Sequence, residues 1–86
     1  MHIVQTHIRD ILEEALRPAQ LTVRDDSHRH AGHAEAGSAQ ETHFFVHIQG
    51  SEELKGLSRV QQQKRVYQLL DALMPHPIHA LAMKIE

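Results

Sequence analysis

The chain has 86 residues and a mass of 9.8 kDa, which is enough for one small hydrophobic core and too little for two. Its composition, 41% hydrophobic and 23% charged, is that of a globular protein, and no segment approaches the ~18 uninterrupted apolar residues of a membrane helix. Nine basic against eleven acidic residues give a net charge of −2, and there are nine histidines and no cysteine, so neither a strongly positive nucleic-acid module nor a disulfide framework is expected.

The first two predicted elements are a helix and a short strand. Apolar residues between Val4 and Leu16 recur at the three- and four-residue spacing of an amphipathic helix, which Pro18 ends. Residues 21–25 then alternate between apolar and polar side chains, and this favours a strand with one buried face. The whole chain, residues 1–86, is interpreted as a single domain.

Residues 26–41 have no hydrophobic periodicity and are rich in glycine, alanine, serine and histidine. The composition predicts a long, mobile connection. Connections of this length are uncommon in compact domains and often carry function. His28, His30 and His33 all lie in it.

The second half of the chain predicts two strands that flank a helix. Residues 42–49 alternate so that Phe44, Val46 and Ile48 share one face, with His43 and His47 on the less buried face. A single helical turn is expected between Gly50 and Gly56. Residues 78–85 form an apolar run that is typical of a strand covered by helices.

The long helix is expected to begin at the capping box Ser58-Arg-Val-Gln61 and to stop at Pro75. One broad arc of this helix is predicted to pack on the sheet. Its apolar residues are Val60, Val66, Tyr67, Leu69, Leu70, Leu73 and Met74. The resulting fold class is α+β in the order α-β-β-α-α-β, with a three-stranded mixed sheet and helices on one face.

The histidines are the main chemical signal. Imidazole is a common ligand for transition metals, but His28, His30 and His33 offer at most three ligands on one connection, without cysteine. A solvated polar loop is the alternative interpretation. His79 precedes an apolar segment, so its side chain is either hydrogen-bonded to backbone or placed for binding. His43 and His47 are interpreted as solvated.

Enzymatic activity is not expected. Asp25, Ser27 and His30 lie close in sequence, but nothing marks Ser27 as an activated nucleophile. No glycine-rich nucleotide-binding motif is present. The N-terminal residues lack the zones of a secretory signal, so a cytoplasmic location is expected.

Four short segments resemble the successive motifs of the BolA family of small cytosolic proteins. They are Leu21-x-Val-x-Asp-Asp-Ser-His-Arg-His30, Glu41-Thr-His-Phe44, Lys55-Gly-Leu-Ser58 and Ile78-His-Ala-Leu81. The resemblance spans nearly the whole chain. It implies an α-β-β-α-α-β fold that is similar to a type II KH domain, in agreement with the order of elements that periodicity predicts.

The resemblance also implies a partner rather than a reaction. BolA proteins bind monothiol glutaredoxins and can share a [2Fe-2S] cluster with the glutaredoxin cysteine and glutathione. Carried over to this chain, the cluster ligands are His79 and His30, with His28 and His33 as competitors. The implied function is that of a non-catalytic adaptor in iron–sulfur trafficking or in iron and redox sensing, in a heterodimer with the glutaredoxin. No membrane partner is expected.

The alternative function is that of a nucleic-acid-binding transcriptional regulator, because some BolA proteins are described in this way. It would use Arg59, Lys64 and Arg65 on the long helix, with DNA as the partner. The family usually carries an Arg-His-Arg run in this helix, whereas this chain has Gln62-Gln63-Lys64. The Gly-x-x-Gly clamp of nucleic-acid-binding KH domains is missing as well.

Overall fold

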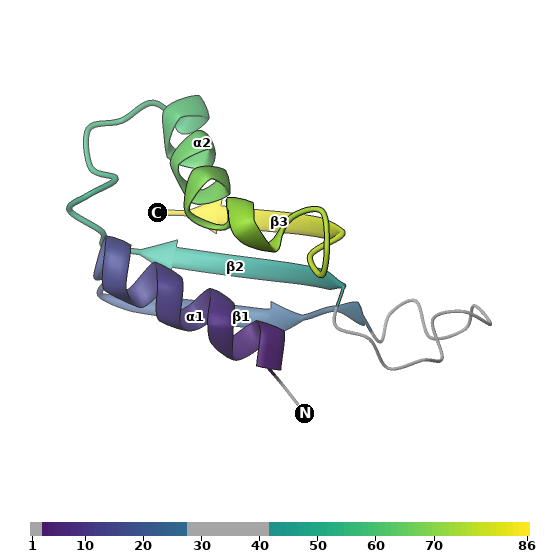
Figure 1. The fold of residues 1–86 in the computed structure, drawn as a ribbon. Coiled ribbons are helices and arrows are strands. Elements are labelled where there is room, and N and C mark those ends of the chain that lie inside the picture. Colours follow the sequence, from purple (N-terminus) through teal and green to yellow (C-terminus); the bar gives the residue numbers. More distant parts are fainter. Residues whose placement is uncertain (1–2, 28–41) are drawn as a thin grey trace.

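The computed structural model describes residues 3–27 and 42–86 (Figure 1). Within these residues, helices and strands follow one another in the order α-β-β-α-β, with a short 3-10 helix after the second α-helix, and the short helix predicted between Gly50 and Gly56 is not formed. The elements are α1 (Ile3–Leu16), β1 (Gln20–Asp25), β2 (His43–Gln49), α2 (Arg59–Leu69), η3 (Asp71–Leu73) and β3 (Ala80–Ile85).

The sheet has the strand order β1-β2-β3. Strand β2 is central and pairs antiparallel with β1 and parallel with β3. In this register Val46 lies opposite Val23 on one side and beside Met83 on the other. Helices α1 and α2 lie on the same side of the sheet (Figure 1). The predicted α+β class, with a mixed three-stranded sheet and helices on one face, is confirmed.

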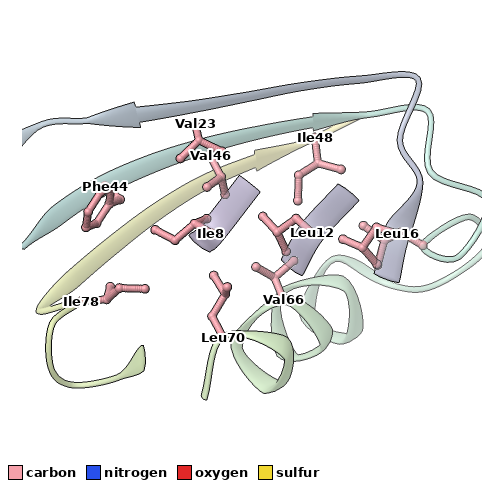
Figure 2. Close-up of a cluster of buried hydrophobic side chains, with 11 residues drawn as sticks. Ile8, Leu12, Leu16, Val23, Phe44, Val46, Ile48, Val66, Leu70 and Ile78 are labelled. Carbon is pink, nitrogen blue, oxygen red and sulfur yellow. The ribbon is translucent and has the colours of Figure 1, made fainter. Parts of the chain in front are cut away.

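The hydrophobic core lies between the sheet and the two helices (Figure 2). Alternate residues of β2 point into it, as the period-two pattern predicts, and the intervening residues are only partly buried. The core side chains that are fully or almost fully buried are Ile8, Leu12, Leu16, Val23, Phe44, Val46, Ile48, Leu54, Val66, Leu70 and Ile78. Each contributes roughly 1.5–3 kcal/mol relative to an exposed side chain.

Helix α2 begins as predicted and ends earlier. The Ser58 hydroxyl accepts the Gln61 amide proton, and the Gln61 side chain in turn accepts the Ser58 amide proton. The predicted apolar arc is wrong in part, because Val60 is 60% exposed and Tyr67 is 41% exposed. In an eleven-residue helix only the narrow stripe through Val66 reaches the core.

Two further expectations need correction. The segment between Gly50 and Gly56 forms hydrogen-bonded turns and no α-helical turn, because its amides bond to carbonyls three residues back, as from Leu54 to Ser51. Strand β3 is an edge strand: one face is partly buried and the other is exposed. The small side chains Ala80 and Ala82 make the exposed face look apolar in the sequence.

Candidate functional site

One end of the sheet brings together the end of β1, the start of β2 and the residue before β3. His43 is paired with Ala80 in the parallel register. The backbone amides of His79 and Ala80 both donate to the Thr42 carbonyl, at 2.8 and 3.2 Å. His79 is therefore held beside Thr42 and His43, although 35 or more residues separate them in sequence.

Ser27 builds the base of this site. Its hydroxyl oxygen accepts hydrogen bonds from the backbone amides of Thr42 (2.8 Å) and His43 (3.1 Å). Its own amide donates to the Asp25 carboxylate at 2.9 Å, and the Asp26 amide donates to the His43 carbonyl at 2.7 Å. Ser27 and Thr42, the two residues that flank segment 28–41, are thus joined by a hydrogen bond at this end of the sheet.

Two imidazole rings lie close together at this end of the sheet. The ring centroids of His43 and His79 are 5.6 Å apart, with an angle of 57° between the ring planes. Nδ1 of His43 lies 2.8 Å from the Thr42 hydroxyl oxygen, and this hydrogen bond orients the ring. A proton on Nδ1 would make Nε2 the nitrogen that coordinates a metal.

His79 is exposed, so it is not a buried histidine that needs a backbone partner. Its ring forms no hydrogen bond with any residue in 3–27 or 42–86, whereas its backbone amide is bonded. This arrangement favours the second interpretation of the sequence, a side chain placed for binding. His28, His30 and His33 lie outside the described residues.

His43 is a candidate ligand that the sequence analysis does not select. Its half-buried position on the less buried face of β2 confirms the predicted alternation. The available signal was its place in the Glu41-Thr-His-Phe44 motif. Its proximity to His79 depends on the parallel pairing of β2 with β3, which no local pattern encodes.

The donor set suits one part of a shared metal site. In the part of the chain that the structure describes, no group of three or more histidine, aspartate or glutamate side chains could hold a metal ion. Two imidazoles on one tetrahedral ion have ring centroids about 5 Å apart, given metal–nitrogen bonds of about 2 Å. The spacing of His43 and His79 therefore fits two ligands, with the remaining ligands supplied from elsewhere.

The basic residues of α2 form a poorer site. Arg59, Lys64 and Arg65 are all exposed. At about 100° per residue, Lys64 points about 140° away from Arg59 and about 100° away from Arg65 around the helix axis. They do not form the single basic stripe that would follow a phosphate backbone.

A separate charged cluster occupies the sheet face opposite the helices. The His47 ring pairs with the Glu86 carboxylate, and Lys84 lies 4.0 Å from the same residue. The hydrogen bond from His47, together with the charge of Lys84, lowers the pKa of the Glu86 carboxyl below its ordinary value. On the same face Arg24 lies over the Phe45 ring.

Comparison with known proteins places this fold in a family. The sequence profile of BolA-like proteins matches residues 12–86. The chain is 35% identical over 82 residues to the DNA-binding transcriptional regulator BolA of Haemophilus influenzae, covering 95% of this chain and 75% of that protein. It is 40% identical over 80 residues to SufE-like protein 1 of Arabidopsis thaliana, covering 88% of this chain and 21% of that protein.

Solved structures agree. BolA1 from Arabidopsis thaliana superposes with a TM-score of 0.82 at 33% identity, covering 95% of this chain and 88% of that one. The BolA domain of SufE1 from the same plant gives 0.81 at 32% identity, covering 96% and 89%. The chain spans about a fifth of SufE-like protein 1 and about half of the mammalian BolA-like protein 1. Sequence, fold and the motifs around His43 and His79 together show that this chain belongs to the BolA-like protein family.

Proposed function

We propose that this chain is a non-catalytic adaptor that binds a monothiol glutaredoxin and, with glutathione, co-ligates a shared [2Fe-2S] cluster. The adaptor would act in iron–sulfur trafficking or in iron and redox sensing. The observation that carries the proposal is the pairing of two imidazoles, His43 and His79, at the sheet end where segment 28–41 is attached. A chain without cysteine needs thiolates from a partner to complete such a site.

Each residue has a defined part in the proposal. His79 supplies one imidazole from the start of β3. The second comes from His30, the first choice from the family motif, with His28, His33 and now His43 as alternatives. The cluster would supply one-electron redox chemistry, and imidazole ligands in place of thiolates raise its potential.

Neighbouring residues position the candidate ligands before a metal binds. The Thr42 carbonyl fixes the backbone of His79 and Ala80, while the Thr42 hydroxyl orients the His43 ring. The His43 ring, which this hydrogen bond already orients, loses little side-chain entropy on binding. Both rings must be neutral to donate a lone pair, so ligation requires deprotonation and weakens in acid.

The test is to mix the purified chain with a cluster-loaded monothiol glutaredoxin and to record visible absorption and circular dichroism. We expect His79→Ala to change or abolish the spectrum of the mixed complex. His7→Ala, which removes an exposed histidine on α1, is the matched control and should leave the spectrum unchanged. An unaltered spectrum in His79→Ala would remove His79 from the ligand set.

Folding of the variant is checked separately. Because the His79 ring is exposed, its removal should change the free energy of unfolding by less than about 0.5 kcal/mol. Urea unfolding measures this directly. An unfolded His79→Ala protein would support a structural role for the histidine instead.

Nucleic-acid binding is the second candidate function, favoured by the name of the Haemophilus influenzae relative, a DNA-binding transcriptional regulator. The net charge of −2 and the spread of Arg59, Lys64 and Arg65 around α2 argue against it. We expect no sequence-specific DNA affinity tighter than about 10⁻⁶ M at physiological salt, the tight end of non-specific binding. A nanomolar, steeply salt-dependent complex that is lost in the double variant Lys64→Ala, Arg65→Ala would reverse this ranking.

The location of the protein remains a prediction. No helix within residues 3–27 and 42–86 is long and apolar enough to cross a membrane. Two of the plant relatives are named as chloroplastic or as chloroplastic and mitochondrial. The cytoplasmic location that the N-terminal sequence suggests is therefore to be tested by fractionation.

A further inference from the structure

The outer edge of β3 carries main-chain groups that face away from β2. The Ala80 amide donates to Thr42, the Glu86 amide donates to Ile48, and the Glu86 carbonyl accepts from Gly50. Even-numbered residues of the strand therefore direct their amides and carbonyls toward β2. By the alternation of a strand, the amides and carbonyls of Leu81, Met83 and Ile85 point outward.

One main-chain group on this edge already has a hydrogen-bond partner. The Tyr67 hydroxyl of α2 donates to the Leu81 carbonyl at 3.3 Å, which occupies the first outward carbonyl. Among the described strands, β3 has a neighbour on the β2 side alone. The open part of the edge is therefore the segment from Met83 to Ile85, close to the end of the strand.

A groove lies along this open segment. Its volume is about 380 Å³. It runs between the first turns of α2 and the last residues of β3, and Arg59, Gln62, Gln63 and residues 83–86 line it. Met83 and Ile85 are partly buried, and they give the groove an apolar component beside the unpaired main chain. An extended peptide needs this combination of an open strand edge and side-chain contacts.

The groove carries one positive charge that no ion pair within the described residues balances. Glu86 is paired with His47 and Lys84, so its carboxylate is already balanced. Arg59 takes part in none of the ion pairs formed within the described residues. The unbalanced charge at the groove is therefore the Arg59 guanidinium, which is well shaped to bind a carboxylate through two hydrogen bonds.

We propose that the outer edge of β3, from Met83 to Ile85, binds an extended segment of a partner protein that directs a carboxylate side chain at Arg59. The segment adds a fourth strand to the sheet and exchanges main-chain hydrogen bonds with Met83 and Ile85. This surface lies about 13 Å along the strand from His79, at about 3.3 Å per residue. It is therefore separate from the proposed cluster ligands and does not depend on them.

Amide hydrogen exchange of the full chain tests the proposal. The probe is a capped six-residue peptide of alternating valine and glutamate, compared with the same peptide with lysine for glutamate. In the free protein the Met83 and Ile85 amides should exchange faster than those of Ala82 and Lys84, which face β2. With the glutamate peptide at about ten times its Kd, exchange at Met83 and Ile85 should slow about tenfold. Ala82 and Lys84 should not respond.

Two substitutions separate the electrostatic and main-chain contributions. Arg59→Glu should abolish the preference for the glutamate peptide and create one for the lysine peptide. A glutamate is tolerated in the first turn of a helix, because the helix dipole favours negative charge there. Arg65→Glu lies on the same helix outside the groove and is the matched control. Met83→Pro removes an outward amide without removing a hydrogen bond to β2, and should weaken binding of the peptide.

Three results would overturn the proposal. The first is unchanged exchange at Met83 and Ile85 when the glutamate peptide is in excess. The second is an equal response to both peptides, which would remove the role of Arg59. The third is protection that rises with protein concentration in the absence of peptide, which would identify a second copy of this chain as the occupant.

Discussion

The hydroxyl oxygen of Ser27 lies 2.8 Å from the amide nitrogen of Thr42 and accepts its hydrogen bond, so that one side chain ties the end of β1 to the start of β2. The same oxygen accepts the His43 amide proton. Ser27 therefore sets the position of His43, and through the Thr42 carbonyl the position of His79 as well. Ser27, which nothing in the sequence marks as an activated nucleophile, has a positioning role.

The first prediction concerns this contact. Ser27→Ala leaves two partly buried amides without their acceptor and should lower the free energy of unfolding by about 1–3 kcal/mol. Urea unfolding measures the loss, and the Thr42 and His43 amides should exchange faster. Ser27→Thr keeps the hydroxyl and is the control. Unchanged exchange at Thr42 and His43 in Ser27→Ala would show that another group fixes this end of the sheet.

The second prediction compares two glycines with positive φ. A Cβ at Gly50 (φ +71°) would lie 2.8 Å from the Ala19 Cβ, whereas a Cβ at Gly56 (φ +86°) would meet nothing within 4 Å. Gly56→Ala should therefore cost only the conformational strain of about 1–2 kcal/mol. Gly50→Ala adds a steric clash and should lower the unfolding midpoint further. Equal midpoints for the two variants would mean that Ala19 moves aside freely.

The elements that face the core could be predicted from the sequence, because burial of one side requires apolar residues at a regular spacing. The stripe of α1 and the alternation of β2 are of this kind, and both elements lie within one residue of their predicted bounds. The Ser58 capping box could be predicted for a different reason, because it is formed by residues within a single turn of the chain. The fold class followed from the order of these elements.

The features that the sequence did not predict depend on how the helices and strands pack against one another. Val60 and Tyr67 are apolar enough for a core, but their side chains are 60% and 41% exposed in the structure. The apolar run of β3 predicts a strand covered by helices, yet only one of its faces is partly buried and the other is exposed. The pairing of His43 with His79 requires the parallel register between β2 and β3, and that register is set by tertiary packing.

The third prediction concerns pH. The hydrogen bond from His47, with Lys84 nearby, lowers the pKa of the Glu86 carboxyl. A lowered folded-state pKa gives stability that is present above the unfolded-state pKa and is lost as the pH falls through the folded-state pKa. His47→Ala should therefore raise the Glu86 pKa toward its ordinary value and reduce the acid dependence of stability.

Carboxyl-carbon NMR titration of Glu86 measures this pKa directly. His76→Ala, which removes an exposed histidine from the turn before β3, is the control and should leave the titration unchanged. A Glu86 pKa that stays low in His47→Ala would assign the shift to Lys84 alone. In that case Lys84→Met should restore the ordinary value.

The last prediction identifies the second imidazole of the proposed cluster site. If His30 is the ligand, His30→Ala should weaken the complex with cluster-loaded glutaredoxin more than His28→Ala or His33→Ala does. The deficit should grow below about pH 6.5, where a free imidazole becomes protonated and loses its lone pair. Titration of the complex by visible circular dichroism at two pH values measures both effects.

The structure adds His43 to this test, because its ring already lies beside that of His79. Equal tolerance of the three single substitutions means that they replace one another or that none of them is a ligand. The triple variant His28→Ala, His30→Ala, His33→Ala separates these cases, since loss of the complex shows replacement. If the triple variant still binds and His43→Ala added to it abolishes binding, the two ligands are His43 and His79, and the pair held by Thr42 is the complete contribution of this chain. Binding that survives all four substitutions leaves His79 as the sole ligand from this chain.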